Sequence, residues 1–190
     1  MPSEKILFIN ACMRPSSRTH ILADRYFAEI CPAGTKREEI RVDDLDIRPL
    51  SGADAAQRDE EIRSGHFENY PLAKQFASAD EIVIAAPLWD TTFPSKLKVY
   101  LEHICVNGIT FGYGRDGKPV KKCRAQRLIY ITTAGGFLWE NSAVKAQMEE
   151  LCGLFCIPDF HFFCGQGLDV FPEKTSEILD ETFQSMHREL

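Results

Sequence analysis

Residues 5–19 read KILFINACMRPSSRT, and the rest of the chain is best interpreted outward from this stretch. Its first half holds the unbroken apolar run ILFI at 6–9, which at this length is typical of a strand buried on both faces of a parallel sheet. Apolar side chains then recur at helical spacing, at 23, 26, 27 and 30. A loop that leaves a parallel strand and enters a helix presents free backbone N–H groups and the positive end of the helix dipole. The stretch therefore predicts an anion site, phosphate above all.

The joint between this strand and helix has the side chains that such a site uses. Ser16, Ser17 and Thr19 offer hydroxyl donors, and Arg14 and Arg18 add positive charge. The plainer alternative is a capped helix start, with Ser17 or Thr19 as the N-cap residue.

The same alternation of strand and helix continues along the chain. Further strands are expected at 38–42, 81–87, 128–132 and 159–164, and helices at 53–62, 67–77, after Pro94, over 144–155 and at the C-terminal end. Strands alternating with helices predict an α/β fold, a doubly wound parallel sheet with helices on both faces. Five strands favour the order 2-1-3-4-5, and the length favours a single domain over residues 1–190.

Composition excludes several classes of partner. The formal charge of −6 argues against nucleic acid and against an anionic membrane surface. No apolar stretch approaches the ~20 residues of a membrane span, and the N-terminus lacks a signal sequence, so a cytoplasmic protein is expected. The cysteines form no spaced metal pairs, which favours reduced core thiols and no metal site. The histidines show no ligand spacing either.

Three loops should meet at one edge of the sheet. In the order 2-1-3-4-5 the first, third and fourth strands are neighbours, so the loops 10–19, 88–93 and 133–136 would line one crevice. Trp89 in the second loop either packs over the sheet or covers a flat ligand. Gly135 and Gly136 in the third form either a tight turn or a close approach of backbone amides to a ring.

Together these segments resemble a known family. The stretches NACMRPSSRT, APLWDTTFPSKLKVYLEHICVNGITFGYG and ITTAGG are similar to the FMN-dependent NAD(P)H:quinone oxidoreductases and azoreductases, which have the flavodoxin-like fold. The resemblance implies FMN as cofactor. Its phosphate would be held at Cys12, Ser17, Arg18 and Thr19. Its isoalloxazine ring would lie against the second and third loops, at Pro87, Leu88, Trp89, Asp90, Thr133, Ala134, Gly135 and Gly136.

The resemblance also implies the activity. NADH or NADPH would reduce FMN and leave, and a quinone or azo compound would then take two electrons in a ping-pong cycle. The flavin carries the chemistry, so no catalytic side chain is expected. Relatives are homodimers in which the second subunit completes the acceptor pocket, and the candidates to line it here are Phe93, Phe111, Tyr113 and Phe137.

Two positions depart from the family pattern. Asp90 stands where an Asn is expected, and a carboxylate only accepts hydrogen bonds and repels negative charge. Phe137 and Leu138 follow the glycines, where some relatives carry a His that could donate a proton.

Two other functions remain open at this point. Cys12 and Arg18 form Cys-x5-Arg followed by Thr, which resembles the phosphate loop of low-molecular-weight protein tyrosine phosphatases, where a thiolate attacks phosphorus. That interpretation leaves the second and third loops unexplained. A flavodoxin-type electron carrier is the third class, although such carriers are usually shorter and more acidic.

Overall fold

The computed structural model describes residues 5–190. The strands are β1 (Lys5–Asn10), β2 (Lys36–Arg41), β3 (Glu81–Ala85), β4 (Arg127–Thr133) and β5 (Asp159–Gly165). The helices are α1 (Arg18–Arg25), α2 (Gly52–Ser64), α3 (Pro71–Ser78), α4 (Ser95–Ile104), α5 (Ala143–Phe155) and α6 (Thr175–Glu189). A π-helical turn, Tyr26–Ile30, extends α1, and short 3-10 turns lie at Val42–Asp44 and Pro172–Lys174.

The five strands form one sheet in the order β2-β1-β3-β4-β5, and every pairing is parallel. The order expected from the sequence is confirmed. The register aligns the strand ends, because Asn10 pairs with Ala85, Ala85 with Ile131, and Thr133 with Gly165. The loops that follow β1, β3, β4 and β5 therefore leave the sheet at one edge, the carboxyl edge.

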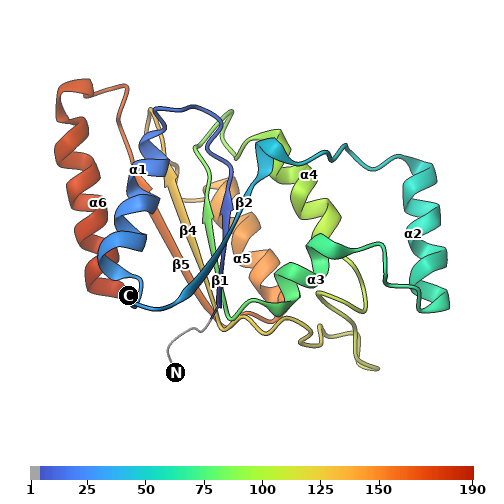
Figure 1. Ribbon diagram of the computed structural model, residues 1–190. Helices are drawn as coiled ribbons and strands as arrows, with labels where there is room; N and C mark the ends of the chain where they lie inside the picture. The colour runs from blue at the N-terminus through green and yellow to red at the C-terminus, as the bar shows by residue number, and fades with distance from the viewer. Residues whose placement is uncertain (1–4) are drawn as a thin grey trace.

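Helices cover both faces of the sheet. Figure 1 shows α1 and α6 on one face and α3, α4 and α5 on the other. Alternate residues of β1 supply the two cores, since Ile6 and Phe8 pack with α1 and α6 while Leu7 and Ile9 pack with the opposite helices. All four of these β1 side chains are fully buried, as the unbroken apolar run predicts.

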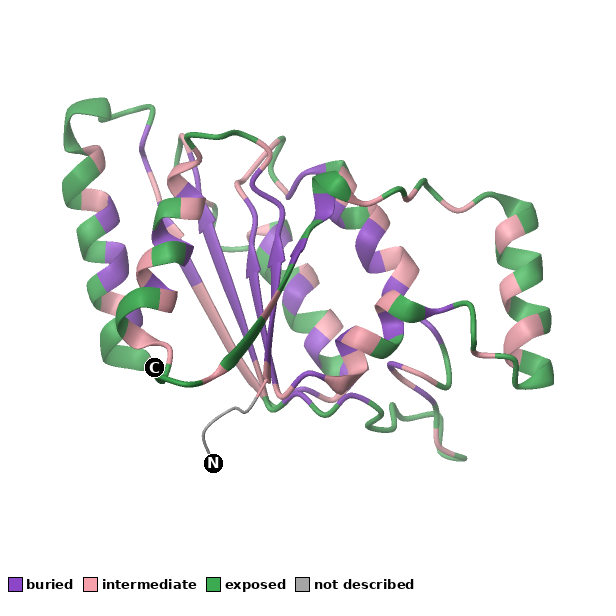
Figure 2. Ribbon diagram, viewed as in Figure 1, coloured by how far each residue is buried: buried purple, intermediate pink, exposed green. Residues whose placement is uncertain are grey.

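Helix α2 differs from the others because none of its residues is buried. It stands away from the sheet at the far side of the molecule (Figure 1), and Figure 2 shows it exposed or half-buried along its whole length. Capping interactions at both ends set the limits of this helix. Ser51 and Asp54 form a capping box at the start, and Gly65 closes the helix in the left-handed conformation with φ of 74°.

Two helices have shorter spans than the sequence suggested. The helix expected at 67–77 begins at Pro71, because a proline in the first turn needs no N–H partner. The sequence suggests that the helix after Pro94 stops at Asn107 and Gly108, but α4 ends at Ile104 because Thr110 caps it. The Thr110 hydroxyl donates to the Ile104 carbonyl at 2.7 Å and accepts from the Val106 amide at 3.1 Å.

Within residues 5–190 no helix combines the length and apolar character needed to cross a bilayer. The expectation of a single domain over 1–190 includes residues 1–4, which lie outside the described part of the chain.

Candidate functional site

A cavity of about 400 Å³ opens at the carboxyl edge of the sheet, and we call it the carboxyl-edge cavity. It lies within the size range of small-molecule and cofactor sites. The loops after β1, β3, β4 and β5 contribute its lining: Arg14, Ser16, Ser17, Arg18, Pro87, Leu88, Trp89, Thr133, Gly135 and Asp169. The three loops that sequence reasoning assigned to one crevice thus surround one cavity.

The first loop presents the start of α1 to this cavity. Ser17 is the N-cap residue, and its Oγ accepts a hydrogen bond from the His20 amide at 3.3 Å. The amides of Arg18 and Thr19 belong to the first turn, where no helical carbonyl can accept from them. Their N–H groups and the helix dipole therefore favour an anion at this end of the cavity. The N-cap interpretation of Ser17 is confirmed, and the anion site stays a prediction that the same turn can accommodate.

Two of the residues assigned to the first loop do not line the cavity. Thr19 is fully buried, and its Oγ1 lies 2.7 Å from Oγ1 of Thr133, which joins the first and third loops. Cys12 is 6% exposed and its thiol donates to the Ala85 carbonyl at 3.6 Å. Burial raises the pKa of Cys12 to about 11. Beneath the cavity, Thr19 therefore connects the first loop to Thr133 at the end of β4, and Cys12 connects it to Ala85 at the end of β3.

Arg18 is already engaged by the loop that follows β5. Its Nη2 donates to Oδ1 of Asp169 at 2.9 Å, and its Nη1 donates to the Leu168 carbonyl at 3.2 Å. Sequence reasoning missed Asp169. The glycines at 165 and 167 marked the end of β5, but only the pairing of β4 with β5 shows that the following loop reaches the first one.

The second loop is a tight hairpin at the cavity wall. Trp89 and Thr92 exchange backbone hydrogen bonds of 2.8 and 2.9 Å around Asp90 and Thr91. Both central residues have positive φ, 48° at Asp90 and 68° at Thr91. Such a two-residue turn usually contains Asn and Gly, so this one is strained. The Arg14 guanidinium lies 5.6 Å from the Trp89 ring centroid, which links the first loop to the second.

The third loop brings backbone to the cavity. Gly135 lines it, whereas Ala134 is buried beneath, and the Thr133 carbonyl accepts from the Leu88 amide at 2.9 Å. A Cβ on Gly135 would collide with the Asp169 carboxylate. A side chain at this position would therefore require the Asp169 carboxylate to move. Gly136 has no atom within 4 Å of its Cβ position and its side faces open space.

The candidates for the acceptor pocket are spread over several loops. Phe93 and Asp90 line a second cavity of about 440 Å³ that shares Trp89 with the first. Phe111 and Tyr113 stack edge to face, with centroids 5.7 Å apart, in the segment after α4. Phe137 is 62% exposed and lies against Phe171 of the loop after β5, at 6.4 Å.

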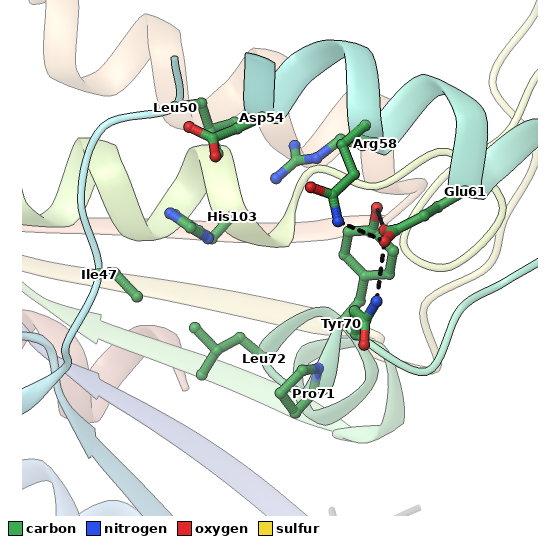
Figure 3. A pocket seen from close by; sticks show the side chains of 11 residues that line it. Ile47, Leu50, Asp54, Arg58, Glu61, Tyr70, Pro71, Leu72 and His103 are labelled. Carbon is green, nitrogen blue, oxygen red and sulfur yellow. Dashed lines mark hydrogen bonds between the residues drawn. The ribbon is translucent and has the colours of Figure 1, made fainter. Parts of the chain in front are cut away.

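A further cavity of about 320 Å³ lies between α2, α3 and α4, remote from these loops. Figure 3 shows Tyr70, Leu72 and Ile47 beneath it and Arg58 and Glu61 of α2 along its rim. The charged groups are satisfied within the protein. Glu61 accepts from the Tyr70 hydroxyl at 2.6 Å, and Arg58 donates to the Glu102 carbonyl at 2.9 Å. This cavity offers no donor set for a phosphate.

In the described part of the chain, His, Cys, Asp and Glu side chains form no group of three or more that could share a metal ion. The donors that line the carboxyl-edge cavity are hydroxyls, guanidinium groups and backbone amides, which suit an anionic organic ligand.

Comparison with known proteins gives a consistent result. Residues 4–190 match a family model described as the flavodoxin-like fold. FMN-dependent NADH:quinone oxidoreductase 2 of Clostridium acetobutylicum is 31% identical over 190 residues, covering 95% of this chain and 94% of that protein. The FMN-dependent NADH:quinone oxidoreductase of Clostridium beijerinckii is 31% identical over 93% of each chain.

Solved structures share the fold. An azoreductase from Bacillus anthracis superposes with a TM-score of 0.83 at 20% identity, over 95% of each chain. An FMN-dependent NADH-azoreductase from the same species, solved in complex with FMN, has a TM-score of 0.77 at 21% identity, covering 97% of this chain and 98% of that one.

Proposed function

Since the chain belongs to the flavodoxin-like fold family that includes the FMN-dependent NADH:quinone oxidoreductases, we propose that it is itself an FMN-dependent oxidoreductase. It takes electrons from NADH, the donor that its relatives are named for, and passes them to a quinone or an azo compound. The observation that carries the proposal is the carboxyl-edge cavity, where a hydroxyl-rich helix start faces an aromatic hairpin and a glycine turn.

The residues present fit FMN. A phosphate is suited to the start of α1, where Ser17, Arg18 and the first-turn amides combine hydroxyl, charge and dipole. A flat ring is suited to the opposite wall, formed by Pro87, Leu88 and Trp89. Gly135 lets backbone approach from the third side.

When bound, FMN supplies two-electron transfer between a nicotinamide and an acceptor. The protein's part is to bind, orient and shield. The first loop would hold the phosphate and so restrict where the ring can lie in the cavity. Trp89 and Leu88, which line the cavity, would exclude water from one face of a bound ring. Backbone amides of the second and third loops would stabilise negative charge on a ring bound beside them. Asp90, exposed at the hairpin tip, has the opposite effect if the ring comes near it.

An absorption spectrum of the purified protein, reconstituted with FMN, tests the proposal. The expected result is a bound flavin whose visible bands bleach when NADH is added without oxygen and return when a quinone follows. Replacing Ser17 and Arg18 together by Ala should weaken FMN binding several-fold or more, because hydrogen bonds to charged groups contribute ~1.5–3 kcal/mol each. A protein that binds no flavin, or a flavin that NADH leaves oxidised, would contradict the proposal.

The acceptor site requires a second subunit in this proposal. Phe137 and Tyr113 are both largely exposed and lie on different loops, so a second copy of the chain is needed to enclose an acceptor between them. Gel filtration tests this directly. A monomer with full activity would argue against it.

A cytoplasmic location fits the cysteines, all seven of which are free thiols.

The phosphatase alternative is poorly supported. Phosphoryl transfer by Cys12 needs a thiolate near neutral pH, whereas burial raises the pKa of this thiol to about 11. The guanidinium of Arg18 faces Asp169 and the Leu168 carbonyl. Turnover of p-nitrophenyl phosphate by a colourless protein would support the phosphatase alternative. Direct oxidation of NADH by the pure protein distinguishes an oxidoreductase from an electron carrier, because a carrier alone does not oxidise NADH.

A further inference from the structure

One carboxylate faces a cavity that otherwise suits an anion. Among the described residues that line the carboxyl-edge cavity, Asp169 is the only acidic one, and Arg14 and Arg18 are the basic ones. The Asp169 side chain is 72% exposed. A carboxylate repels a phosphate at short range, so an acidic side chain is unexpected beside a helix start that suits a phosphate.

Asp169 is held in place through its backbone. Gly167 donates to the Gly136 carbonyl at 2.8 Å, Leu168 to the Ala134 carbonyl at 3.2 Å, and Asp169 to the Gly135 carbonyl at 2.9 Å. These bonds join the loop after β5 to the loop after β4, beyond the last paired residues, Thr133 and Gly165. The Cα of Asp169 therefore cannot withdraw from the cavity, and only its side chain is free to turn.

The carboxylate lies where it can neutralise Arg18. Its Oδ1 accepts from Arg18 Nη2 at 2.9 Å, while its other oxygen lies over Gly135. Arg18 also occupies the first turn of α1, where the helix dipole adds positive potential. The pair with Asp169 thus balances the positive charge of Arg18 at the helix start.

We propose that Asp169 is the resident counterion of Arg18, and that it competes with the phosphate of the flavin nucleotide for this arginine. The inference rests on the proposed function and adds a residue that sets the affinity and selectivity of the cofactor site. When the phosphate binds, it takes over hydrogen bonds that Asp169 made, and the side chain turns toward solvent. Asp169 thus limits how strongly the site prefers FMN to riboflavin, which lacks the phosphate.

The test measures binding of FMN and of riboflavin to the flavin-free protein by quenching of flavin fluorescence. Asp169→Asn keeps the shape and an oxygen that accepts from Arg18, but removes the charge. The expected result is FMN binding tighter by about five- to tenfold, the size of effect expected for one nearby charge in a partly solvated site, with riboflavin binding unchanged. Asp169→Ala should move the FMN affinity in the same direction.

Asp180→Asn is the matched control. Asp180 also pairs with an arginine, its Oδ1 lying 2.6 Å from Arg25 Nη1 with the side chain 61% exposed, but it does not line the carboxyl-edge cavity. It should leave the affinities for both flavins unchanged. In an Arg18→Ala background, Asp169→Asn should have a smaller effect, because competition for Arg18 is gone and only the direct repulsion between carboxylate and phosphate remains.

Three outcomes overturn the inference. Weaker FMN binding by Asp169→Asn would mean that Asp169 positions Arg18 for the phosphate. An equal change for FMN and riboflavin would place its effect on the ring. No change in either affinity would mean that the carboxylate does not sense the phosphate. A wild-type protein that binds neither flavin would instead refute the proposed function, so the two failures are distinguishable.

Discussion

The strained residues at the tip of the second loop are the least expected feature at the scale of single residues. Asp90 and Thr91 have φ of 48° and 68°, in the left-handed region that β-branched side chains rarely adopt. The reciprocal bonds between Trp89 and Thr92 force this geometry. The hairpin therefore positions Trp89 at the cavity wall at the expense of local strain.

Replacing Thr91 by Gly should relieve that strain. We expect the free energy of unfolding to rise by about 0.5–1 kcal/mol, since removing the left-handed penalty outweighs the added backbone entropy of glycine. Urea denaturation measures it. Thr92→Gly is the control, because Thr92 has no positive φ and should lose stability on the same substitution. Equal destabilisation by both variants would show that the loop is not strained.

Two buried tyrosines give a second test at this scale. Tyr100 is fully buried, and its hydroxyl has no hydrogen-bond partner among the described residues. Tyr26 instead donates to Oε1 of Glu81 at 2.6 Å. Tyr100→Phe should leave the free energy of unfolding unchanged or raise it by up to about 1 kcal/mol, whereas Tyr26→Phe should lower it by about 1–3 kcal/mol. Chemical denaturation of both variants measures these free energies, and a large loss of stability in Tyr100→Phe would contradict the prediction.

At the scale of elements, the best-predicted strands were those with long buried apolar runs. The apolar run at 6–9 and the mostly apolar run at 128–132 correspond to β1 and β4, which are buried on both faces. Helix boundaries were less predictable because side-chain caps such as Thr110 set them. The partners of Arg18 could not be predicted at all. Asp169 lies 151 residues away, and only the three-dimensional pairing of the loops brings it there.

Helix α2 is held mainly by polar contacts. Arg58 donates to the carbonyls of Glu102 and Cys105 at 2.9 and 3.3 Å, capping the end of α4, and Glu61 accepts from Tyr70. With no buried residue of its own, α2 has less apolar anchoring than the other helices, although the half-buried Ile62 packs against the cluster of Tyr70, Ala73 and Val106.

Arg58→Ala should therefore release α2 while the sheet stays folded. Amide hydrogen exchange over residues 52–64 should accelerate by about tenfold or more, with the exchange of β1 and β4 unchanged. Arg63→Ala is the matched control, because Arg63 pairs only with Glu60 of the same helix among the described residues. If both variants exchange alike, Arg58 does not tether the helix.

At the scale of the whole molecule, the sheet order followed from the alternation of strands and helices, and that order alone placed three distant loops at one edge. The cavity they surround was thus anticipated in outline. Its fourth side was not, since the loop after β5 carries no motif of its own, only the glycines at 165 and 167 and then Asp169.

The buried thiols make the fold sensitive to alkali. Burial raises the pKa of Cys12 and Cys105 to about 11, and that of Cys123, Cys152 and Cys164 to about 12, from 9.0 in each case. A group whose pKa is higher in the folded than in the unfolded protein stabilises the fold fully below the unfolded pKa. That contribution is lost as pH rises toward the folded pKa, here from about pH 9 upward, by ~1.4 kcal/mol per pH unit for each thiol.

We therefore expect the urea midpoint to fall steeply between pH 8.5 and 10.5, and Cys152→Ala to make that fall shallower. Cys152 is 4% exposed in α5 and its pKa is raised by desolvation first, so removing it removes one titrating group. Leu154→Ala on the same helix loses packing without a titrating group and should shift the whole curve down in parallel. Urea denaturation at several pH values separates the slope from the offset. Identical slopes in wild type and Cys152→Ala would mean that thiol burial does not set the alkaline limit of this fold.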